Sequence, residues 1–486
     1  MALSDSEWLS RLLRQWQYDV LLRRTWNALY DSLQPRRDPV PQYRAAYERI
    51  LMMARTPWAR LVVDLTEERL KVQGFQFGEE EAENDLLWEL FRANSMEAMQ
   101  SVVHREAVTT GTSYVSVWPS EGDPDTPNIR AESSLNVTHE NQSGDPQVVA
   151  AALKVWLDTA SGEARANMYF PDRVVRYATQ VTTSEIATVD LYSEAFAMRG
   201  GWEPISEVGH DYGTVPMVPF TTRPDYRGYG RSDLRDIAEI IARIEYLTSN
   251  TMLAVELGAL RQKWATGLEI PTDPDGNEVE PFKVALDRLW ISEDPDSKFG
   301  AFPATDITPY LKAISDAIGQ LSAVSRIPPT YFVQTDLANP PSAASLEASE
   351  TGLINKINER QVGYGESWET VARLVMKVAK VEAPTDALAT LNVLWKDART
   401  RSDSQIMDAA AKMQAVGVPW EAIMEFIGFT PEEISRMESQ RAADVFQKLM
   451  QGAIVGQAPP GLSTPSPLGS PGQTGGAPNP PVSNGG

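Results

Sequence analysis

Two long helical stretches separated by a proline-rich segment constrain the fold of this chain more than any other feature. The first stretch runs from about Ser232 to Arg261 and the second from Thr308 to Ser325, and both carry apolar residues at helical spacing. At 1.5 Å per residue, the first helix would be about 45 Å long. The apolar stripe of the first helix contains Leu234, Ile237, Ile241 and Ile244, and that of the second contains Leu311, Ile314, Ile318 and Leu321.

The segment between the two helices, residues 263–305, is expected to be irregular because prolines recur along it. One strand-like piece is expected at Leu289-Trp290-Ile291. The second helix then begins cleanly, since Thr308 is a favourable N-cap and Pro309 suits the first helical position. The pattern therefore predicts two rigid helices that bracket an insertion. Their stripes can pack against each other within one chain and can also contact a second copy, because a two-helix hairpin cannot bury its whole surface alone.

The residues before the first long helix divide into a helical part and a strand-rich part. The first helices are expected over 5–33, 43–55 and 80–110, and the last of these ends at Gly111. From Thr112 to about Phe220, short runs of β-forming residues alternate with turn clusters, which predicts a small antiparallel β domain and an α+β fold class overall. The expected strands are 113–118, 148–157, 166–170, 174–179, 186–192 and 215–220.

The residues after the second long helix are expected to form a loop, a longer helix and a compact helical region. Ile327-Pro328-Pro329 ends the second helix, and a loop reaches Pro340-Pro341. The next helix spans about 342–380, with a kink expected at Gly363 and Gly365. The remaining expected elements are a strand at 388–395, helices between 402 and 451 and a disordered tail after 451. Within the helical region we expect a capping box at Ser402 to Gln405, a C-cap at Gly417 and a second helix that stops at Gly428.

The residues that usually carry catalysis or bind metals are sparse. The chain has no cysteine and only three histidines, in different expected elements, and it has no nucleotide-binding glycine loop with lysine. Asp273, Asp275 and Asn277 have the spacing of half a calcium loop, but Val284 stands where the bidentate glutamate belongs, so a simple turn is the better interpretation. We therefore predict no catalytic, cofactor or metal site, and no enzyme. No signal peptide or membrane span is expected either.

The net charge of −22 would ordinarily argue against a nucleic-acid-binding protein, because phosphate affinity comes from lysine and arginine. A channel through which DNA must slide has the opposite requirement, since an acidic wall repels the duplex and a basic wall would retard it. The same charge is equally consistent with a protein that is merely kept soluble. Charge alone therefore supports a DNA conduit only weakly.

Four groups of short motifs follow one another in a characteristic order within residues 40–400. The first contains Trp58, Val62-Val63-Asp64 and Glu67 to Phe75, and the second contains Trp88, Asn94, Glu106-Ala107-Val108, Gly111 and Ser113-Tyr114-Val115. The third contains Val215 to Phe220, Arg223-Pro224, Gly228 to Leu234 and Arg261 to Gly267, and the fourth contains Ser325 to Pro329, Pro341-Ser342, Leu346 and Glu350. Together they resemble the portal proteins of long-tailed double-stranded-DNA phages. Leu29 to Pro35 departs from the Tyr-Tyr-x-Gly turn that such portals often have there.

The resemblance implies a portal fold with named regions. It assigns residues 1–230 to a wing, 231–262 and 306–327 to two stem helices, 263–305 to a clip, and 328–341 to a tunnel loop that faces DNA. Residues 342–400 would be the long helix and its return to the wing, 401–451 the crown, and 452–486 the tail. The implied DNA-facing residues are Gln334, Thr335, Asp336 and Asn339, and the implied partner-binding residues of the clip are Asp273, Asp275, Asn277 and Trp290.

The implied function is that of a ring subunit at the head vertex of the virion, assembled in the host cytoplasm, through which DNA is packaged and ejected. The implied partners are further copies of the chain, twelve in all, together with the major capsid protein, the head–tail adaptor, the terminase and double-stranded DNA contacted without sequence specificity. Two alternatives stay open at this point. One is another head–tail connector or capsid protein, and the other is a DNA-packaging enzyme, which the missing nucleotide motif disfavours.

Overall fold

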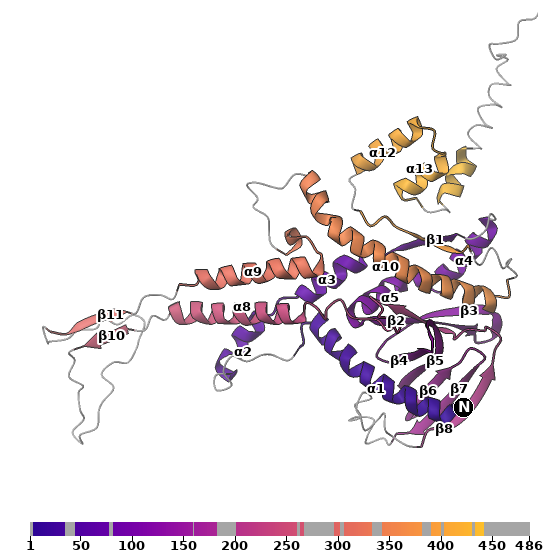
Figure 1. Cartoon of the computed structure of the whole chain (residues 1–486), viewed down its shortest axis with the longest axis horizontal. Coiled ribbons are helices and arrows are strands. Elements are labelled where there is room, and N and C mark those ends of the chain that lie inside the picture. Colours follow the sequence, from indigo (N-terminus) through magenta and orange to yellow (C-terminus); the bar gives the residue numbers. More distant parts are fainter. Residues whose placement is uncertain are drawn as a thin grey trace, which may run out of the picture. The chain divides into compact units, whose positions relative to one another are not determined.

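The computed structural model describes residues 3–34, 44–76, 81–158, 160–181, 201–259, 263–266, 296–301, 306–332, 343–381, 390–399, 403–429 and 433–441. The chain separates into two units, residues 1–412 and 413–486, and each is considered by itself. The first unit combines helices with several antiparallel sheets (Figure 1). The α+β class predicted from the sequence is confirmed at this level.

The helices of the first unit lie before, between and after the strands. They are α1 (Asp5–Tyr30), α2 (Arg44–Met53), α3 (Trp58–Glu67), α4 (Glu81–Ala93), α5 (Met96–Thr110), α8 (Ala238–Ala259), α9 (Thr308–Ser325), the short 3-10 helix η2 (Pro329–Tyr331) and α10 (Ala343–Val378). Helix α12 (Asp403–Ala415) follows in the chain. Helix α3 was missed by the sequence analysis, which placed no element between residues 55 and 80.

The strands form four antiparallel groups. Their bounds are β1 (Val72–Gln76), β2 (Thr112–Ser120), β3 (Asp123–Glu132), β4 (Val137–Gln142), β5 (Asp145–Asp158), β6 (Glu163–Tyr169), β7 (Arg173–Gln180), β8 (Glu203–Gly209), β9 (Met217–Thr221), β10 (Lys263–Thr266), β11 (Lys298–Ala301) and β12 (Asn392–Trp395). The sheet orders are β3-β2-β9, β4-β5-β6-β7-β8, β1-β12 and β10-β11. The predicted antiparallel β domain is therefore two sheets. Strands β1, β3, β4 and β8 were missed, and the strand expected at 186–192 lies outside the described residues.

Helix α1 begins with a complete capping box and covers one face of the five-stranded sheet (Figure 1). The Ser4 hydroxyl accepts the Glu7 amide, and the Glu7 carboxylate accepts the Ser4 amide at 2.7 Å. Every third or fourth residue of the helix is then apolar and buried against the sheet, namely Leu9, Leu12, Leu13, Trp16 and Val20. Because α1 covers this face of the five-stranded sheet, the opposite face is the one left for other contacts.

The helix expected over 80–110 is in fact two helices, α4 and α5, and the prediction of one continuous helix was wrong. Ser95 adopts a left-handed backbone conformation with φ of 58°, which no α-helix can contain. The preceding Asn94 side chain instead bonds to strand β3, accepting the Ile129 amide at 2.9 Å and donating to the Pro127 carbonyl at 3.2 Å. The predicted C-cap at Gly111 is confirmed, with φ of 95°.

Helix α8 begins six residues later than predicted, because the residues before it are held by tertiary contacts. Ser232 donates from its hydroxyl to the Thr109 carbonyl, and the Asp233 amide donates to the Val108 carbonyl at 3.2 Å. The helix therefore spans 22 residues and is about 33 Å long rather than 45 Å.

Helix α9 also begins differently from the prediction. Ile307 rather than Thr308 is the N-cap. The side chain and the amide of Thr308 both hydrogen-bond to the Asp306 carboxylate, the amide at 2.9 Å, and these bonds lower the pKa of Asp306. The carboxylate of Asp306 thus performs the capping role that the sequence analysis gave to the Thr308 hydroxyl.

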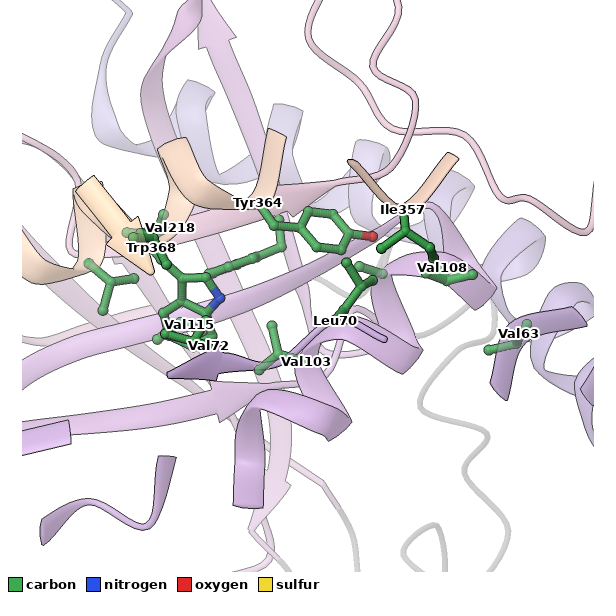
Figure 2. Close-up of a cluster of buried hydrophobic side chains, with 14 of the residues drawn as sticks. Val63, Leu70, Val72, Val103, Val108, Val115, Val218, Ile357, Tyr364 and Trp368 are labelled. Carbon is green, nitrogen blue, oxygen red and sulfur yellow. The ribbon is translucent and has the colours of Figure 1, made fainter. Parts of the chain in front are cut away.

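The 36-residue helix α10 crosses the core of the first unit, where it packs on β2, β3, β9 and β12. Figure 2 shows Tyr364 and Trp368 of this helix among the valines that line the core. Both side chains are fully buried, and the Trp368 indole donates to His104 at 2.9 Å. The helix runs without interruption through Gly363 and Gly365, where a kink was expected. Tight packing of the flanking turns offsets the low helix propensity of these glycines.

The second unit contains helix α13 (Trp420–Ile427) and a helical stretch at 433–441. Gly417 and Gly428 have φ of 86° and 107°, so both helix ends predicted at these glycines are confirmed. The Arg441 guanidinium lies over the Trp420 ring, 5.3 Å from its centroid. The capping box expected at Ser402 and the tail after 451 lie outside the described residues.

Candidate functional site

Helices α8 and α9 lie side by side and project from the body of the first unit, followed by the strand pair β10–β11 (Figure 1). We call these four elements the arm. Strands β10 and β11 pair antiparallel, with Lys263 opposite Ala301 and Thr266 opposite Lys298. The sequence analysis described this segment as irregular and missed the pair, because four-residue strands give too short an alternation to detect.

The predicted apolar stripes of the arm change from buried to exposed along its length. On α8, and just before it, Leu234, Ile237, Ile241 and Ile244 are fully buried, where α3 and α2 also contact the helix. On α9, Leu321 is fully buried, Ile314 and Ile318 are half-buried, and Leu311 is 52% exposed. Further exposed apolar residues of the arm are Tyr246, Val255 and Trp264, together with Val324 at the end of α9 nearer the body.

The base of the arm is held to α10 by a buried ion cluster. Asp233, just before α8, lies 2.9 Å from Lys356 Nζ and 3.0 Å from Arg360 Nη2. All three side chains are at least nine-tenths buried. Burial alone would raise the pKa of Asp233, but the two adjacent cations outweigh it and lower that pKa. The carboxylate is therefore ionised and clamps α8 onto α10.

A polar cavity of about 250 Å³ lies beside this cluster. Its walls include two more ion pairs, Arg223–Asp236 at 2.7 Å and Arg326–Glu359 at 3.8 Å. Arg326 is the C-cap of α9 and has a left-handed backbone conformation, with φ of 61°. The end of α9, the start of α8 and α10 thus meet in one charged junction.

The chain leaves this junction through η2, which packs against the body. The Tyr331 hydroxyl donates to Glu350 at 2.6 Å, and Arg69 lies 3.3 Å from the same carboxylate. The Phe332 ring packs on Trp58 with centroids 5.5 Å apart. The beginning of the predicted tunnel loop, 328–332, is therefore fixed rather than free.

The structure places only some of the predicted site residues. Of the predicted stripe residues, all except Leu311 belong to one apolar core cluster or pack against it. The residues Asp273, Asp275, Asn277, Trp290, Gln334, Thr335, Asp336 and Asn339 lie outside the described residues.

Sequence reasoning missed the Asp233, Lys356 and Arg360 cluster. Lys356 and Arg360 stand four residues apart on α10 with buried Ile357 between them, and two cations at the edge of an apolar stripe could have indicated a buried carboxylate partner.

The described part of the chain offers no arrangement typical of catalysis. It contains no group of three or more His, Asp or Glu residues placed to hold a metal ion. His104 is buried between the Leu70 carbonyl, 3.0 Å from Nδ1, and the Trp368 indole, and burial lowers its pKa to about 4. It is therefore a neutral core residue. In the same part of the chain, no helix is both long and apolar enough to span a membrane.

Comparison with known proteins gives consistent results. The sequence model of the family "Phage portal protein, SPP1 Gp6-like" matches residues 24–445. The portal protein of Mycobacterium phage D29 is 27% identical over 416 residues, covering 81% of this chain and 80% of that protein. The portal protein of Mycobacterium phage L5 is 27% identical over 446 residues, covering 86% and 85%. A chain of the virion of native gene transfer agent (GTA) particle is similar in structure, with a TM-score of 0.44, 11% identity and coverage of 85% and 99%.

The family match spans most of the chain and includes the body, the arm and the charged junction. The chain therefore belongs to the SPP1 Gp6-like family of phage portal proteins, structural and non-enzymatic virion proteins that form the opening at a capsid vertex through which DNA passes.

Proposed function

We propose that the arms of neighbouring subunits pack against one another to form the wall of the DNA channel. Family membership implies an oligomeric ring associated with the capsid, and the proposal adds which surface closes that ring. The observation that carries it is the exposure of Leu311, Val255 and Tyr246 on helices whose stripe residues nearer the body are buried. A neighbouring arm would cover these side chains.

The energetics support this use of the arm. Burying one such side chain contributes about 1.5–3 kcal/mol, so a few of them on each subunit provide a substantial association energy in a closed ring. In a ring, each subunit presents two different surfaces, one to each neighbour, and a pair of helices has two such faces. We propose twelve subunits, the number that the portal resemblance implies.

The regional assignment follows from the same proposal. Residues 1–230 form the wing, 231–262 and 306–327 the stem, 263–305 the clip, 328–341 the tunnel loop, 342–400 the long helix and its return to the wing, and 401–451 the crown. The ring would contact the major capsid protein and would assemble in the host cytoplasm.

The clip is proposed to dock the head–tail adaptor and, during packaging, the terminase. Strands β10 and β11 support this role because they give the segment between them a fixed base. Replacing residues 268–296 with a Gly/Ser linker should leave rings intact and abolish adaptor binding. Retained adaptor binding would move the docking surface elsewhere.

The tunnel loop is proposed to face the DNA. Its neutral side chains Gln334, Thr335 and Asn339 can touch a sliding phosphate backbone without retaining it, whereas arginines would grip it. Replacing these three with arginine should slow packaging, most strongly at low salt, while rings still form. Packaging at the normal rate in low salt would show that the loop lies away from the DNA.

The ring interface is tested by light scattering after gel filtration. The unaltered protein should have a mass many times 53.7 kDa. The double variant Val255→Glu/Leu311→Glu should shift that mass toward the monomer, because carboxylates would enter the apolar contact. Val148→Glu, at an exposed apolar position 44% accessible on β5, is the matched control and should leave the mass unchanged. A double variant that keeps its full mass would show that the arm is not the interface.

A further inference from the structure

The two large sheets of the body enclose a cleft whose lining is unusual for the space between sheets. One face of the five-stranded sheet is covered by α1 and is apolar (Figure 1). Facing sheets normally bury apolar side chains between them. Here only one end of the inter-sheet space is filled in that way, by the cluster of Tyr114, Val137, Ala152, Tyr169, Val174, Val215 and Met217.

The other end opens as a cleft of about 410 Å³. Strand pairing explains its floor, because Lys154, Asn167, Arg176 and Ser206 stand opposite one another across β5, β6, β7 and β8. Trp156 and Arg165 form the next pair on the same face. The wall comes from the three-stranded sheet, where Ser116 pairs with Arg130 and Trp118 pairs with Asn128.

The charge of this lining is opposite to that of the whole chain. Four cations line the cleft, Arg130, Lys154, Arg165 and Arg176, against two carboxylates, Glu121 and Glu132. The whole chain has a net charge of −22, whereas this lining carries two more cations than carboxylates.

Two of the four cations are already paired. Lys154 lies 2.7 Å from Glu132, and Arg165 lies within 3.3 Å of Asp158 and Glu163. Among the described residues, neither Arg130 nor Arg176 is within ion-pair distance of a carboxylate, and Arg130 bonds only to the neutral Asn128 amide at 3.0 Å. The two unneutralised arginines stand on opposite sides of the cleft, one in each sheet.

We propose that this cleft binds an acidic peptide segment, with Arg130 and Arg176 pairing its carboxylates and Trp118 and Trp156 packing on the residues between them. Arginine is suited to this role because its planar guanidinium binds carboxylates through two parallel hydrogen bonds. The volume lies in the range of ligand pockets and accepts a few residues of an extended chain. The proposal does not depend on how the ring closes.

Phosphate ligands fit the lining less well than a peptide. A phosphate concentrates up to two charges in one place, and Glu121 on the same wall would repel it, whereas Glu132 is already paired with Lys154. An extended peptide carries single charges at intervals, so it can set carboxylates beside the arginines and neutral residues beside the glutamates. The observations therefore favour a peptide over a nucleotide.

Binding is tested on the full chain by fluorescence anisotropy with a labelled short peptide in which glutamates alternate with leucines and serines. The unaltered protein should bind it, and the same peptide with glutamine for glutamate should bind at least about tenfold more weakly. Arg130→Gln and Arg176→Gln should each weaken binding about tenfold. Arg235→Gln, which removes an equally exposed arginine before α8, is the matched control and should bind normally.

A second variant tests whether weaker peptide binding could be an indirect effect of removing an arginine. Ser206→Glu places a carboxylate opposite Arg176 and should also abolish peptide binding, with the melting temperature unchanged because Ser206 lies on a wholly exposed strand. No binding of the acidic peptide, or equal binding by the arginine variants, would overturn the proposal. So would stronger binding of thymidine monophosphate or inorganic phosphate that the same variants remove, since the cleft would then be a phosphate site.

Discussion

The body around α10 and the arm both contain amphipathic helices, but the apolar side chains of these helices are buried to different extents. In the body, Trp368 is fully buried and its one polar atom is bonded to His104. In the apolar stripe of the arm, Leu321 is fully buried but Leu311 is 52% exposed. The core face of α10 is covered by elements of the same chain, whereas the arm leaves part of its apolar stripe uncovered.

The difference shows that helical periodicity alone does not predict whether an apolar stripe is covered by the same chain or by a second copy. Helices α9 and α10 both place apolar residues every three or four positions, which predicts that one face of each helix is buried. Whether that face is buried by the same chain or by a second copy depends on the elements that surround it. Each prediction below changes one region while the other serves as its reference.

The largest effect is expected in the body at Trp368. Replacing Trp368 with alanine removes a fully buried ring that packs edge-on against Phe91 and Phe220, so unfolding should become easier by about 5 kcal/mol. Trp368→Phe, which keeps an aromatic ring in the core but loses the bond to His104 and part of the ring volume, should cost less. Chemical denaturation followed by circular dichroism measures both, and a small loss for the alanine variant would contradict the tight core described here.

The next effect is expected where the body holds the arm. Asp233→Asn leaves Lys356 and Arg360 buried without a counter-charge, which should cost about 3 kcal/mol. Asp236→Asn is the control, because its pair with Arg223 is two-fifths exposed or more and should contribute less than about 1 kcal/mol. Equal losses for the two variants in thermal unfolding would show that the buried cluster has no special role.

The third prediction uses pH to sharpen the contrast. The pKa of His104 falls from 6.5 to about 4 on folding, because burial disfavours the imidazolium. The unfolded chain therefore binds the proton more readily, and the stability from neutral His104 is complete above pH 6.5 and lost as the pH falls toward 4. Between pH 7 and pH 5 this loss is about 2 kcal/mol.

The contribution of His104 is isolated by comparing variants. His104→Gln cannot titrate, so its unfolding free energy should fall less steeply than that of the unaltered protein over this range. His139, whose pKa is also lowered, to about 3, remains in both proteins and cancels in the comparison. Parallel pH profiles for the two proteins would exclude His104 as the titrating group.

The smallest effect is expected on the arm. Leu311→Ala should change the unfolding free energy of isolated subunits by less than about 0.5 kcal/mol, because the side chain is already 52% exposed. Leu321→Ala, at a fully buried position on the same helix, should cost about 3 kcal/mol. A large loss at Leu311 would mean that the arm buries it within its own chain.

Local signals in the sequence predicted much of the fold. The helices α8 and α9, the helix ends at Gly111, Gly417 and Gly428, and the α+β class all depend on spacing or on single residues, and the structure confirms them. The start of α8 could not be predicted, because contacts of Ser232 and Asp233 with residues more than a hundred positions away delay it.

The candidate sites were harder to predict than the helices. Asp233 meets Lys356 and Arg360 only because the fold brings residues far apart in sequence together, and no local pattern encodes that meeting. The cationic cleft requires the register of two sheets, and three of their strands, β3, β4 and β8, were missed. The family, by contrast, was recognised from motifs in order, which needs no knowledge of contacts.

The uneven burial of the arm also determines which of its parts are protected from hydrogen exchange and proteolysis before subunits assemble. Segments held by few buried contacts open at a lower free energy than the core, and opened segments are where proteases cut. In a free subunit, the end of α8 near Val255 and the start of α9 near Leu311 should therefore exchange their amide hydrogens and be cleaved before the residues around Leu321. A neighbouring subunit that covered them would close these sites, so copies that fail to assemble would be the ones degraded.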